Sequence, residues 1–154
     1  MKACPEDVVF VKEIEIECGL SAWTAEDYLQ EVNANNNYFL TVRNRETVIG
    51  FILARLIMNN NCLLDEFEDE FDIEIYNLAV KKEFRREKIA TSLINRVIKM
   101  GKEKNACKVH LEVRESNKEG INFYRRNLFN IIGKRPNFYS NPTENGILMC
   151  RDLA

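Results

Sequence analysis

Apolar residues recur at every third or fourth position from residue 89 to residue 104, and this spacing predicts the clearest helix of the chain. Polar residues occupy the opposite face, and Asn105 predicts the end of the helix. The apolar positions form three pairs, Ile89/Ala90, Leu93/Ile94 and Val97/Ile98. We therefore expect one side of this helix to pack on a hydrophobic core.

Alternation of apolar and polar residues predicts the strands. From residue 108 to residue 114 the alternation is regular, and it places His110, Glu112 and Arg114 on the polar face. The complete set of expected strands is Tyr38–Val42, Val48–Met58, Ile73–Val80, Lys108–Arg114, Asn130–Lys134 and Ile147–Arg151. The first two predict an antiparallel hairpin, and a loop rich in Asn, Pro and Gly joins the last two.

Two helices are expected before the first strand. Pro5-Glu6-Asp7 provides favourable first-turn chemistry for a helix over residues 5–18. Thr24 is a candidate N-cap for a second helix over Ala25–Val32, with Asp27 three residues further on.

A fourth helix is expected near the C-terminus. Ser116 and Glu119 form a candidate capping box, and Ile121, Tyr124 and Leu128 then fall on one stripe. The order of elements is therefore αα-ββ-β-α-β-α-ββ, which predicts an α+β or mixed α/β domain built on a central sheet.

The composition is that of an ordinary globular domain and argues against several classes of protein. Of the 154 residues, 45% are hydrophobic and 30% charged, so we expect a single folded domain over residues 1–154. The net charge of −2 is unlike the basic footprint of a nucleic-acid binder. No apolar run approaches the roughly 18–20 residues that span a bilayer. The first seven residues do not resemble a signal peptide, and we expect a cytoplasmic monomer without nucleic-acid or membrane partners.

The cysteine and histidine content limits the possible chemistry. The five cysteines lie far apart, without the C-x-x-C spacing of a zinc site, so we expect free thiols and no metal. His110 is the single histidine. Catalysis by a Cys-His or Ser-His pair would have to pass through that residue.

A basic turn before the helix at residue 89 is a candidate anion site. It follows the strand that ends at Val80, and residues 81–104 carry nine Lys or Arg against three Glu. Free N–H groups and the helix dipole favour anions at such a position. The alternative is a solvated helix face.

Three blocks of the sequence resemble the GNAT acetyltransferase superfamily. They are Asn77–Ala90, the run Leu111-Glu-Val-Arg-Glu-Ser-Asn117, and the pattern I-x-x-Y-x-x-x-x-F from Ile121 to Phe129. The last two blocks, with Asn-Phe-Tyr at residues 137–139, resemble most closely the RimI type, which acetylates the N-terminal alanine of a small-subunit ribosomal protein. The resemblance implies a GNAT fold, with a mostly antiparallel mixed sheet of about six or seven strands flanked by about four helices.

The resemblance also implies acetyl-CoA as the cosubstrate. The family's phosphate-binding loop, Q/R-x-x-G-x-G/A, corresponds to Arg85-Arg86-Glu87-Lys88-Ile89-Ala90, followed by Thr91, and Lys88 replaces the first glycine. Backbone groups of Leu78, Ala79 and Val80 would pair with the pantetheine arm. Asn117 matches an asparagine near the cofactor, and its alternative role is to cap a helix.

Glu112 matches the family's general base, and Tyr124 matches its general acid. An α-amine has a pKa of about 7.7–8.0 and is largely protonated at neutral pH, so a carboxylate is needed to remove a proton. Tyr124 would contact the cofactor and protonate the departing thiolate. The alternatives are a surface Glu112 paired with Arg114, and a core tyrosine at position 124. His110 matches no catalytic position, and we interpret it as structural.

The acceptor side of the family site corresponds to Trp23, Thr24, Asn77 and Tyr139. Trp23 could instead be a packing aromatic, and Tyr139 part of an aromatic cluster at a strand end. The acidic run over residues 65–74 could attract basic substrates, although we favour a solvated loop.

The sequence thus predicts acetyl transfer from acetyl-CoA to the N-terminal α-amine of a protein, by direct attack in a ternary complex. By resemblance, the acceptor is the N-terminal alanine of a ribosomal protein. Two alternatives stay open. One is acetylation of a small-molecule amine or a lysine side chain, and the other is a non-catalytic acyl-CoA-binding module, for which Lys88 is the main reason.

Overall fold

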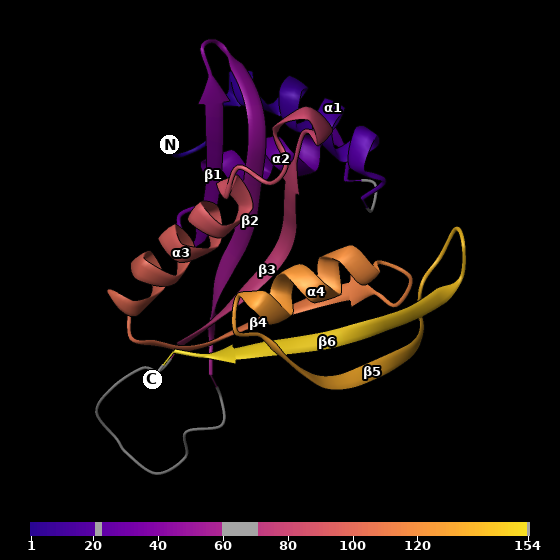
Figure 1. Ribbon diagram of the computed structural model, residues 1–154. Helices are drawn as coiled ribbons and strands as arrows, with labels where there is room; N and C mark the ends of the chain where they lie inside the picture. Colours follow the sequence, from indigo (N-terminus) through magenta and orange to yellow (C-terminus); the bar gives the residue numbers. More distant parts are fainter. Residues whose placement is uncertain (21–22, 60–70, 154) are drawn as a thin grey trace.

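The computed structural model describes residues 1–20, 23–59 and 71–153 (Figure 1). Cys62 and residues 65–70 of the acidic run therefore lie outside the described residues. The described helices are α1 (Val8–Cys18), α2 (Ala25–Asn33), α3 (Ile89–Lys102) and α4 (Lys118–Arg126). The described strands are β1 (Asn37–Asn44), β2 (Thr47–Met58), β3 (Phe71–Val80), β4 (Ala106–Arg114), β5 (Asn130–Tyr139) and β6 (Glu144–Asp152).

The strands form one sheet in the order β1-β2-β3-β4-β6-β5. β3 and β4 run parallel, and every other neighbouring pair is antiparallel. The α3 helix connects the parallel pair, as a crossover between parallel strands requires. The expected mixed, mostly antiparallel sheet is confirmed, with six strands and four helices in the described part of the chain.

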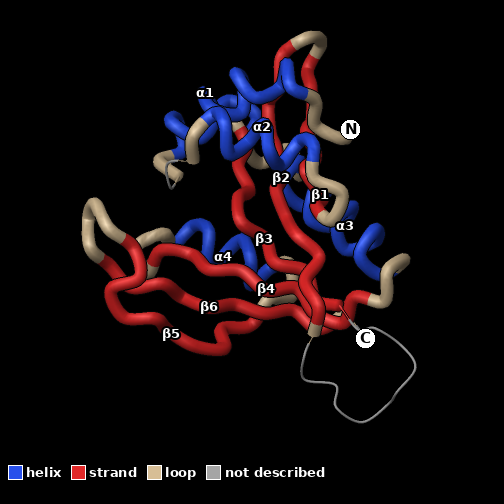
Figure 2. The backbone as a smooth tube through the Cα atoms, turned by 180° about the vertical axis from the view of Figure 1, so that it is seen from behind, coloured by secondary structure: helices blue, strands red, loops and turns tan. Residues whose placement is uncertain are grey.

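Helices cover both faces of the sheet (Figures 1 and 2). α1 and α2 pack over one core, in which the rings of Tyr28, Phe39 and Phe51 are fully buried with centroids 5.8–6.3 Å apart. α3 and α4 pack over the other, which includes Leu93, Ile94, Val97 and Ile98 of α3. The apolar stripe of the clearest predicted helix therefore does face a core.

Two local predictions are confirmed in detail. The Thr24 hydroxyl accepts a hydrogen bond from the Asp27 backbone N–H at 3.1 Å, and the Asp27 carboxylate accepts one from the Thr24 N–H at 2.7 Å. This reciprocal pair caps α2, as predicted. β1 and β2 form the expected antiparallel hairpin.

The start of α4 differs from the prediction. Asn117, not Ser116, is the N-cap, and its side-chain oxygen accepts a hydrogen bond from the Gly120 N–H at 2.9 Å. The Ser116 hydroxyl donates instead to Glu144 at 3.1 Å. Leu128 is also wrong as a core residue, because the chain turns to a positive φ there and leaves the side chain 68% exposed, while Phe129 is buried.

The ends of three elements were also wrong. α3 ends at Lys102 instead of residue 104, and Asn105 has a left-handed φ of 57°. β5 continues to Tyr139 and β6 begins at Glu144, so the predicted long loop is reduced to a short connection. β5 is an edge strand, and Pro136 lies in the irregular stretch between Arg135 and Tyr139 that is not paired with β6.

Within the described residues, no helix is long and apolar enough to cross a membrane, and no cluster of three potential metal ligands occurs. Cys4, Cys18, Cys107 and Cys150 are in no disulfide.

Candidate active site

The two parallel strands at the centre of the sheet separate part-way along their length. Their pairing ends at Ile75 and Leu111, although β3 continues to Val80 and β4 to Arg114. An irregularity in the pairing with β2 leaves Tyr76 as an extra residue at this point, and such a bulge bends a strand. Figures 1 and 2 show β3 leaving β4 at a steep angle. We call the space between these two diverging ends the opening.

One edge of β3 beyond Ile75 has no strand partner among the described residues. Leu78, Ala79 and Val80 pair with β2 on their other edge only. The Val80 carbonyl already accepts hydrogen bonds from Arg85 Nε at 3.3 Å and from the Cys18 thiol at 3.6 Å. The remaining backbone groups of this edge are available to an extended ligand.

The turn after β3 leads into an α3 N-terminus that no side chain caps. Lys88, the N-cap residue, has a φ of 61°, and Arg86 has a φ of 68°. The N–H groups of Ile89, Ala90 and Thr91 form the first turn, where no intrahelical acceptor exists. The turn contacts α1 through an ion pair, Lys81 Nζ at 3.9 Å from Glu13, and through the Lys82 N–H, which donates to Glu17 at 2.8 Å. The uncapped helix end is suited to an anion.

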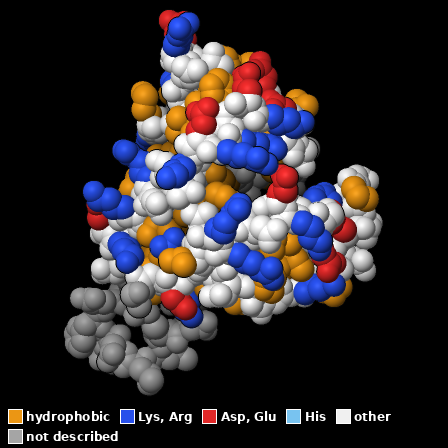
Figure 3. Space-filling model, in the orientation of Figure 1, with side chains coloured by type: hydrophobic (Ala, Val, Ile, Leu, Met, Phe, Trp, Pro, Cys, Tyr) orange, Lys and Arg blue, Asp and Glu red, His pale blue; other side chains and the backbone are white. Residues whose placement is uncertain are grey.

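Positive charge surrounds this helix end. Arg85, Arg86 and Lys88 are all exposed, and Arg85 Nη2 lies 3.3 Å from the Cys18 sulfur. Figure 3 shows Lys and Arg side chains gathered on the face that α3 and α4 cover. The predicted anion site is therefore supported by backbone geometry as well as by charge.

Glu112 lies on β4 just beyond the last β3–β4 pair. Its Oε1 accepts a hydrogen bond from Arg135 Nη1 at 2.5 Å. Its Oε2 is buried and has no hydrogen-bond partner among the described residues. A buried acceptor without a partner is costly, and such atoms are often functional. The alternative pairing with Arg114 is wrong, because Arg114 binds Glu144 at 2.8 Å.

Tyr124 on α4 packs its ring edge-on against Phe123 and Phe129, with centroids 5.3 and 5.6 Å away. Burial, with a smaller contribution from nearby Tyr139, raises the pKa of the Tyr124 hydroxyl above its ordinary value. Neither a side-chain nor a backbone group in the described ranges forms a hydrogen bond with this hydroxyl. A phenol in this state keeps its proton and can donate it.

Tyr139, at the end of β5, belongs to the same group of side chains. Its ring lies under the Arg114 guanidinium, 4.5 Å from ring centroid to Cζ. Burial, followed by the negative charge of Glu112, raises the pKa of the Tyr139 hydroxyl to about 12. The structure thus brings Glu112, Tyr124 and Tyr139 together from three different elements.

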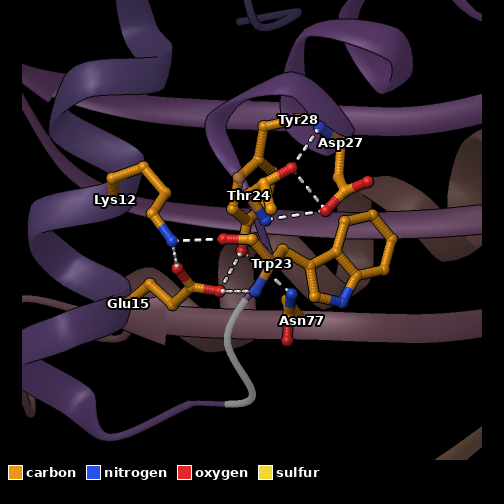
Figure 4. Close-up of polar contacts among 7 residues, drawn as sticks. All are labelled: Lys12, Glu15, Trp23, Thr24, Asp27, Tyr28 and Asn77. Atoms are coloured by element: carbon orange, nitrogen blue, oxygen red, sulfur yellow. Dashed lines mark hydrogen bonds and ion pairs between the residues drawn. The ribbon is translucent and has the colours of Figure 1, made fainter.

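Three of the predicted acceptor-side residues form a second group beneath α1 and α2 (Figure 4). The Trp23 ring packs against Tyr28 and Tyr76, with centroids 5.5 and 5.9 Å apart. Thr24 has its side chain engaged in capping α2. Asn77 on β3 donates to the Tyr28 hydroxyl at 3.0 Å.

A hollow of about 290 Å³ opens next to Trp23 and is lined by Asp27, Gln30, Glu31 and Arg55. Sequence reasoning missed Arg55, whose guanidinium lies 4.7 Å from the Tyr76 ring centroid and pairs with Glu31. It also missed Arg135 and Glu15. A buried glutamate on the apolar face of α1, next to Val11 and Ile14, was a signal that could have been recognised.

His110 and Asn117 have structural partners. His110 Nε2 lies 2.9 Å from Asp72, which is buried, so this part of the predicted acidic run is not a solvated loop. Asn117 caps α4, and its predicted contact with the cofactor stays a prediction.

The sequence matches the acetyltransferase (GNAT) family over residues 8–128. The chain belongs to this family. It is therefore an acetyl-CoA-dependent N-acetyltransferase.

Individual comparisons point to the RimI type within the family. A candidate ribosomal protein bS18-alanine N-acetyltransferase of Bacillus subtilis (strain 168) is 27% identical over 145 residues, which are 94% of this chain and 88% of that protein. The crystal structure of the ribosomal-protein-S18-alanine N-acetyltransferase from Escherichia coli has a TM-score of 0.79, at 19% identity, covering 100% of this chain and 92% of that one.

The same fold occurs in a structure that contains the cosubstrate. Arabidopsis thaliana NAA60 in complex with acetyl-CoA has a TM-score of 0.83 at 21% identity, covering 96% of this chain and 94% of that chain. In the present GNAT protein, the uncapped α3 N-terminus and the free β3 edge are suited to the diphosphate and amide groups of such a ligand.

Proposed function

We propose that this enzyme transfers acetyl from acetyl-CoA to the N-terminal α-amine of a protein, with the N-terminal alanine of a small-subunit ribosomal protein as the acceptor. The observation that carries the proposal is Glu112 Oε2, which is buried at the opening between β3 and β4 and has no partner among the residues that the structure describes. The assigned activity of the Bacillus subtilis relative supports the choice of acceptor.

Acetyl-CoA is proposed to lie across the opening. The N–H groups at the start of α3 and the loop from Arg85 to Lys88 hold the diphosphate, and Lys88 adds a positive charge. The free edge of Leu78, Ala79 and Val80 pairs with the pantetheine arm. This arrangement directs the thioester toward Glu112 and Tyr124.

Glu112 is proposed as the general base. Arg135 fixes the carboxylate through Oε1, which leaves Oε2 to accept a proton from the ammonium group, directly or through a water molecule. The neutral amine then attacks the thioester carbonyl. Much of the rate comes from holding the amine and the thioester in attack geometry.

Tyr124 is proposed as the general acid. The new N–C bond forms, the C–S bond breaks, and the thiolate takes the Tyr124 proton. Glu112 keeps the first proton of the ammonium group, and the second proton that the nitrogen loses on becoming an amide passes through solvent to the Tyr124 oxygen, which restores the phenol. The raised pKa keeps Tyr124 protonated before the reaction. No covalent enzyme intermediate is needed.

The acceptor peptide is proposed to reach the opening past Trp23, just before α2, and Tyr139, at the end of β5. The Thr24 hydroxyl is already hydrogen-bonded to Asp27, so Thr24 affects peptide binding by fixing where α2 begins. Asp27 beside Trp23 adds negative charge that favours a basic residue downstream of the amine, whereas Glu31 in the same hollow is already paired with Arg55.

Release of the CoA thiol from acetyl-CoA tests the proposal with two matched peptides. One has a free N-terminal alanine followed by a basic residue and contains no lysine. Its twin has the same length but a blocked N-terminus and an internal lysine. Release with the free peptide alone supports the proposal, and release with the blocked twin would move the enzyme to lysine or small-molecule amines.

A further inference from the structure

A chain of buried hydrogen bonds connects α1 to the opening. It runs from Lys12 and Glu15 through Tyr28 to Asn77 (Figure 4). Glu15 is 2% exposed, Tyr28 0% and Asn77 6%. Burying polar groups is costly unless they are hydrogen-bonded, so a connected set of this kind needs a physical explanation.

The chemistry of the chain fixes the direction of each hydrogen bond. Glu15 is ion-paired with Lys12 and is therefore a carboxylate, which can only accept. The Tyr28 hydroxyl must donate to Glu15 Oε1, 3.1 Å away, and it accepts from Asn77 Nδ2 at 3.0 Å. Burial, reinforced by Glu15, raises the pKa of Tyr28 above its ordinary value, so the hydroxyl keeps this proton.

The chain therefore fixes the Asn77 amide in one of its two orientations. The amide nitrogen faces Tyr28, and Oδ1 points away from it, as Figure 4 shows. Within the described residues, the hydrogen bond of the Asn77 side chain is the one that Nδ2 donates to Tyr28, and none is donated to Oδ1. This oxygen is an acceptor without a partner within the described ranges.

Asn77 and Glu112 face the opening from the same side of the sheet. Ile75 and Leu111, the last paired residues, both belong to the core beneath α3 and α4. Glu112 follows Leu111 and so points to the α1 and α2 side, where Asn77 meets Tyr28. The two side chains therefore stand on neighbouring strands at the start of the opening.

We propose that Asn77 Oδ1 accepts a hydrogen bond from the acceptor's α-amine, and that Glu15 and Tyr28 act as positioning residues that set the amide. The proposal rests on the proposed function. A neutral amine has two N–H donors and one lone pair, and only the lone pair attacks the thioester. An amide oxygen takes one N–H and leaves the lone pair free, whereas a reversed amide would donate to the lone pair and block the attack.

Steady-state kinetics with the free-N-terminus peptide tests the proposal, using Asn77→Ala and Tyr28→Phe. Asn77→Ala is expected to lower kcat/KM for the peptide by about tenfold or more, since a hydrogen bond to a charged or reacting group is lost. Tyr28→Phe frees the amide to turn and is expected to cause a smaller loss of about three- to tenfold. The KM for acetyl-CoA stays unchanged in both variants.

Two matched controls remove the same groups elsewhere. Asn33→Ala deletes an exposed amide at the end of α2, and Tyr38→Phe deletes a hydroxyl that donates to Met100 at 3.3 Å beneath α3. Both are expected to keep wild-type kcat/KM. Thermal melting identifies any variant that does not fold. If Asn77→Ala does not fold, the kinetics of Tyr28→Phe test the proposal instead.

The double variant separates positioning from simple stabilisation. If Tyr28 acts through Asn77, adding Tyr28→Phe to Asn77→Ala lowers kcat/KM no further, although it still lowers the melting temperature. If the two substitutions instead lower kcat/KM by independent factors that multiply in the double variant, the positioning role of Tyr28 is overturned. Wild-type kcat/KM in Asn77→Ala would overturn the whole inference while leaving the proposed function intact. An inactive wild-type enzyme with this peptide would overturn both.

Discussion

Glu112 shows how the two oxygens of one carboxylate can be given different environments. Arg135 holds Oε1 from the neighbouring hairpin, and Oε2 is buried without a partner in the described part of the chain. The alternation in β4 correctly predicts which face Glu112 occupies. It could not predict Arg135 as the partner, because the β5–β6 pairing contains two irregularities that change which residues meet.

Gly146 keeps the space around Glu112 Oε2 open, and filling that space is expected to impair catalysis. A Cβ at this position would lie 3.2 Å from Oε2 and 3.1 Å from the Phe138 ring. Gly146→Ala is therefore expected to lower kcat by about tenfold or more, because small displacements of a general base are costly. CoA release assays measure kcat, and acetyl-CoA affinity is expected to stay unchanged.

Gly133→Ala is the matched control for this prediction. Gly133 lies on β5, and a Cβ there meets only Leu148 at an ordinary distance of 3.7 Å. It is expected to retain wild-type kcat. Equal activity of the two alanine variants would show that the space at Gly146 is not needed.

At the scale of elements, the start of α3 depends on a backbone conformation that its sequence does not favour. Lys88 has a φ of 61°, where a Cβ costs about 1 kcal/mol and glycine costs nothing. Charge and periodicity predicted an anion site here, but a positive φ at lysine cannot be read from composition. The family loop has a glycine where this chain has Lys88, and the positive φ at that position explains why glycine suits it.

Lys88→Gly and Lys88→Ala are expected to separate conformation from charge. Glycine relieves the left-handed strain, so Lys88→Gly should be more stable than Lys88→Ala by about 1 kcal/mol, the reverse of their usual order in helices. Urea unfolding measures the difference. Both variants lose the ammonium and are expected to bind CoA up to about fivefold more weakly at low salt.

An alanine variant as stable as the glycine variant would contradict the conformational part of this prediction. A much weaker CoA complex for alanine than for glycine would show that the Cβ itself crowds the phosphate site. The charge-matched control is Lys99→Ala, in the last turn of the same helix.

Helix and strand identities were predictable because each face has a consistent periodicity, as in α3 and β4. The ends were less predictable. Asn117 caps α4 because the Ser116 hydroxyl is taken by Glu144, a residue from β6 that is distant in sequence. The length of β5 depends on its pairing with β6, which compensates for Pro136 and Asn137 in an otherwise weak strand.

At the scale of the whole molecule, the separation of β3 from β4 creates the site. It depends on a parallel pairing that stops after Leu111 and on the extra residue Tyr76. Neither the end of this pairing nor the extra residue is visible in the pattern of apolar residues. The residues near the opening could be predicted one by one, but the network that joins α1 to Asn77 could not.

Buried tyrosines are expected to make the fold sensitive to alkaline pH. Burial raises the pKa of Tyr28, Tyr124 and Tyr139 above the ordinary value of 10.0. Above about pH 10 the unfolded chain releases protons that the folded chain retains, so stability is present below that pH and falls as pH rises further.

Urea unfolding at several pH values between about 9 and 11 measures this dependence. The free energy of unfolding is expected to fall less steeply with pH in Tyr28→Phe than in the wild-type protein. An identical slope in the two proteins would contradict a strongly raised Tyr28 pKa in the folded state.

The most direct test of the account is the turnover of acetyl-CoA and a free-N-terminus peptide by Glu112→Gln and Tyr124→Phe, with acetyl-CoA affinity measured in the same proteins. The account predicts that kcat falls by about 10²–10⁴-fold in Glu112→Gln and clearly in Tyr124→Phe, while both bind acetyl-CoA normally. Glu103→Gln, at the exposed end of α3, is expected to behave as wild type. Wild-type kcat in Glu112→Gln would contradict the account, because the reaction would then need no base at the opening.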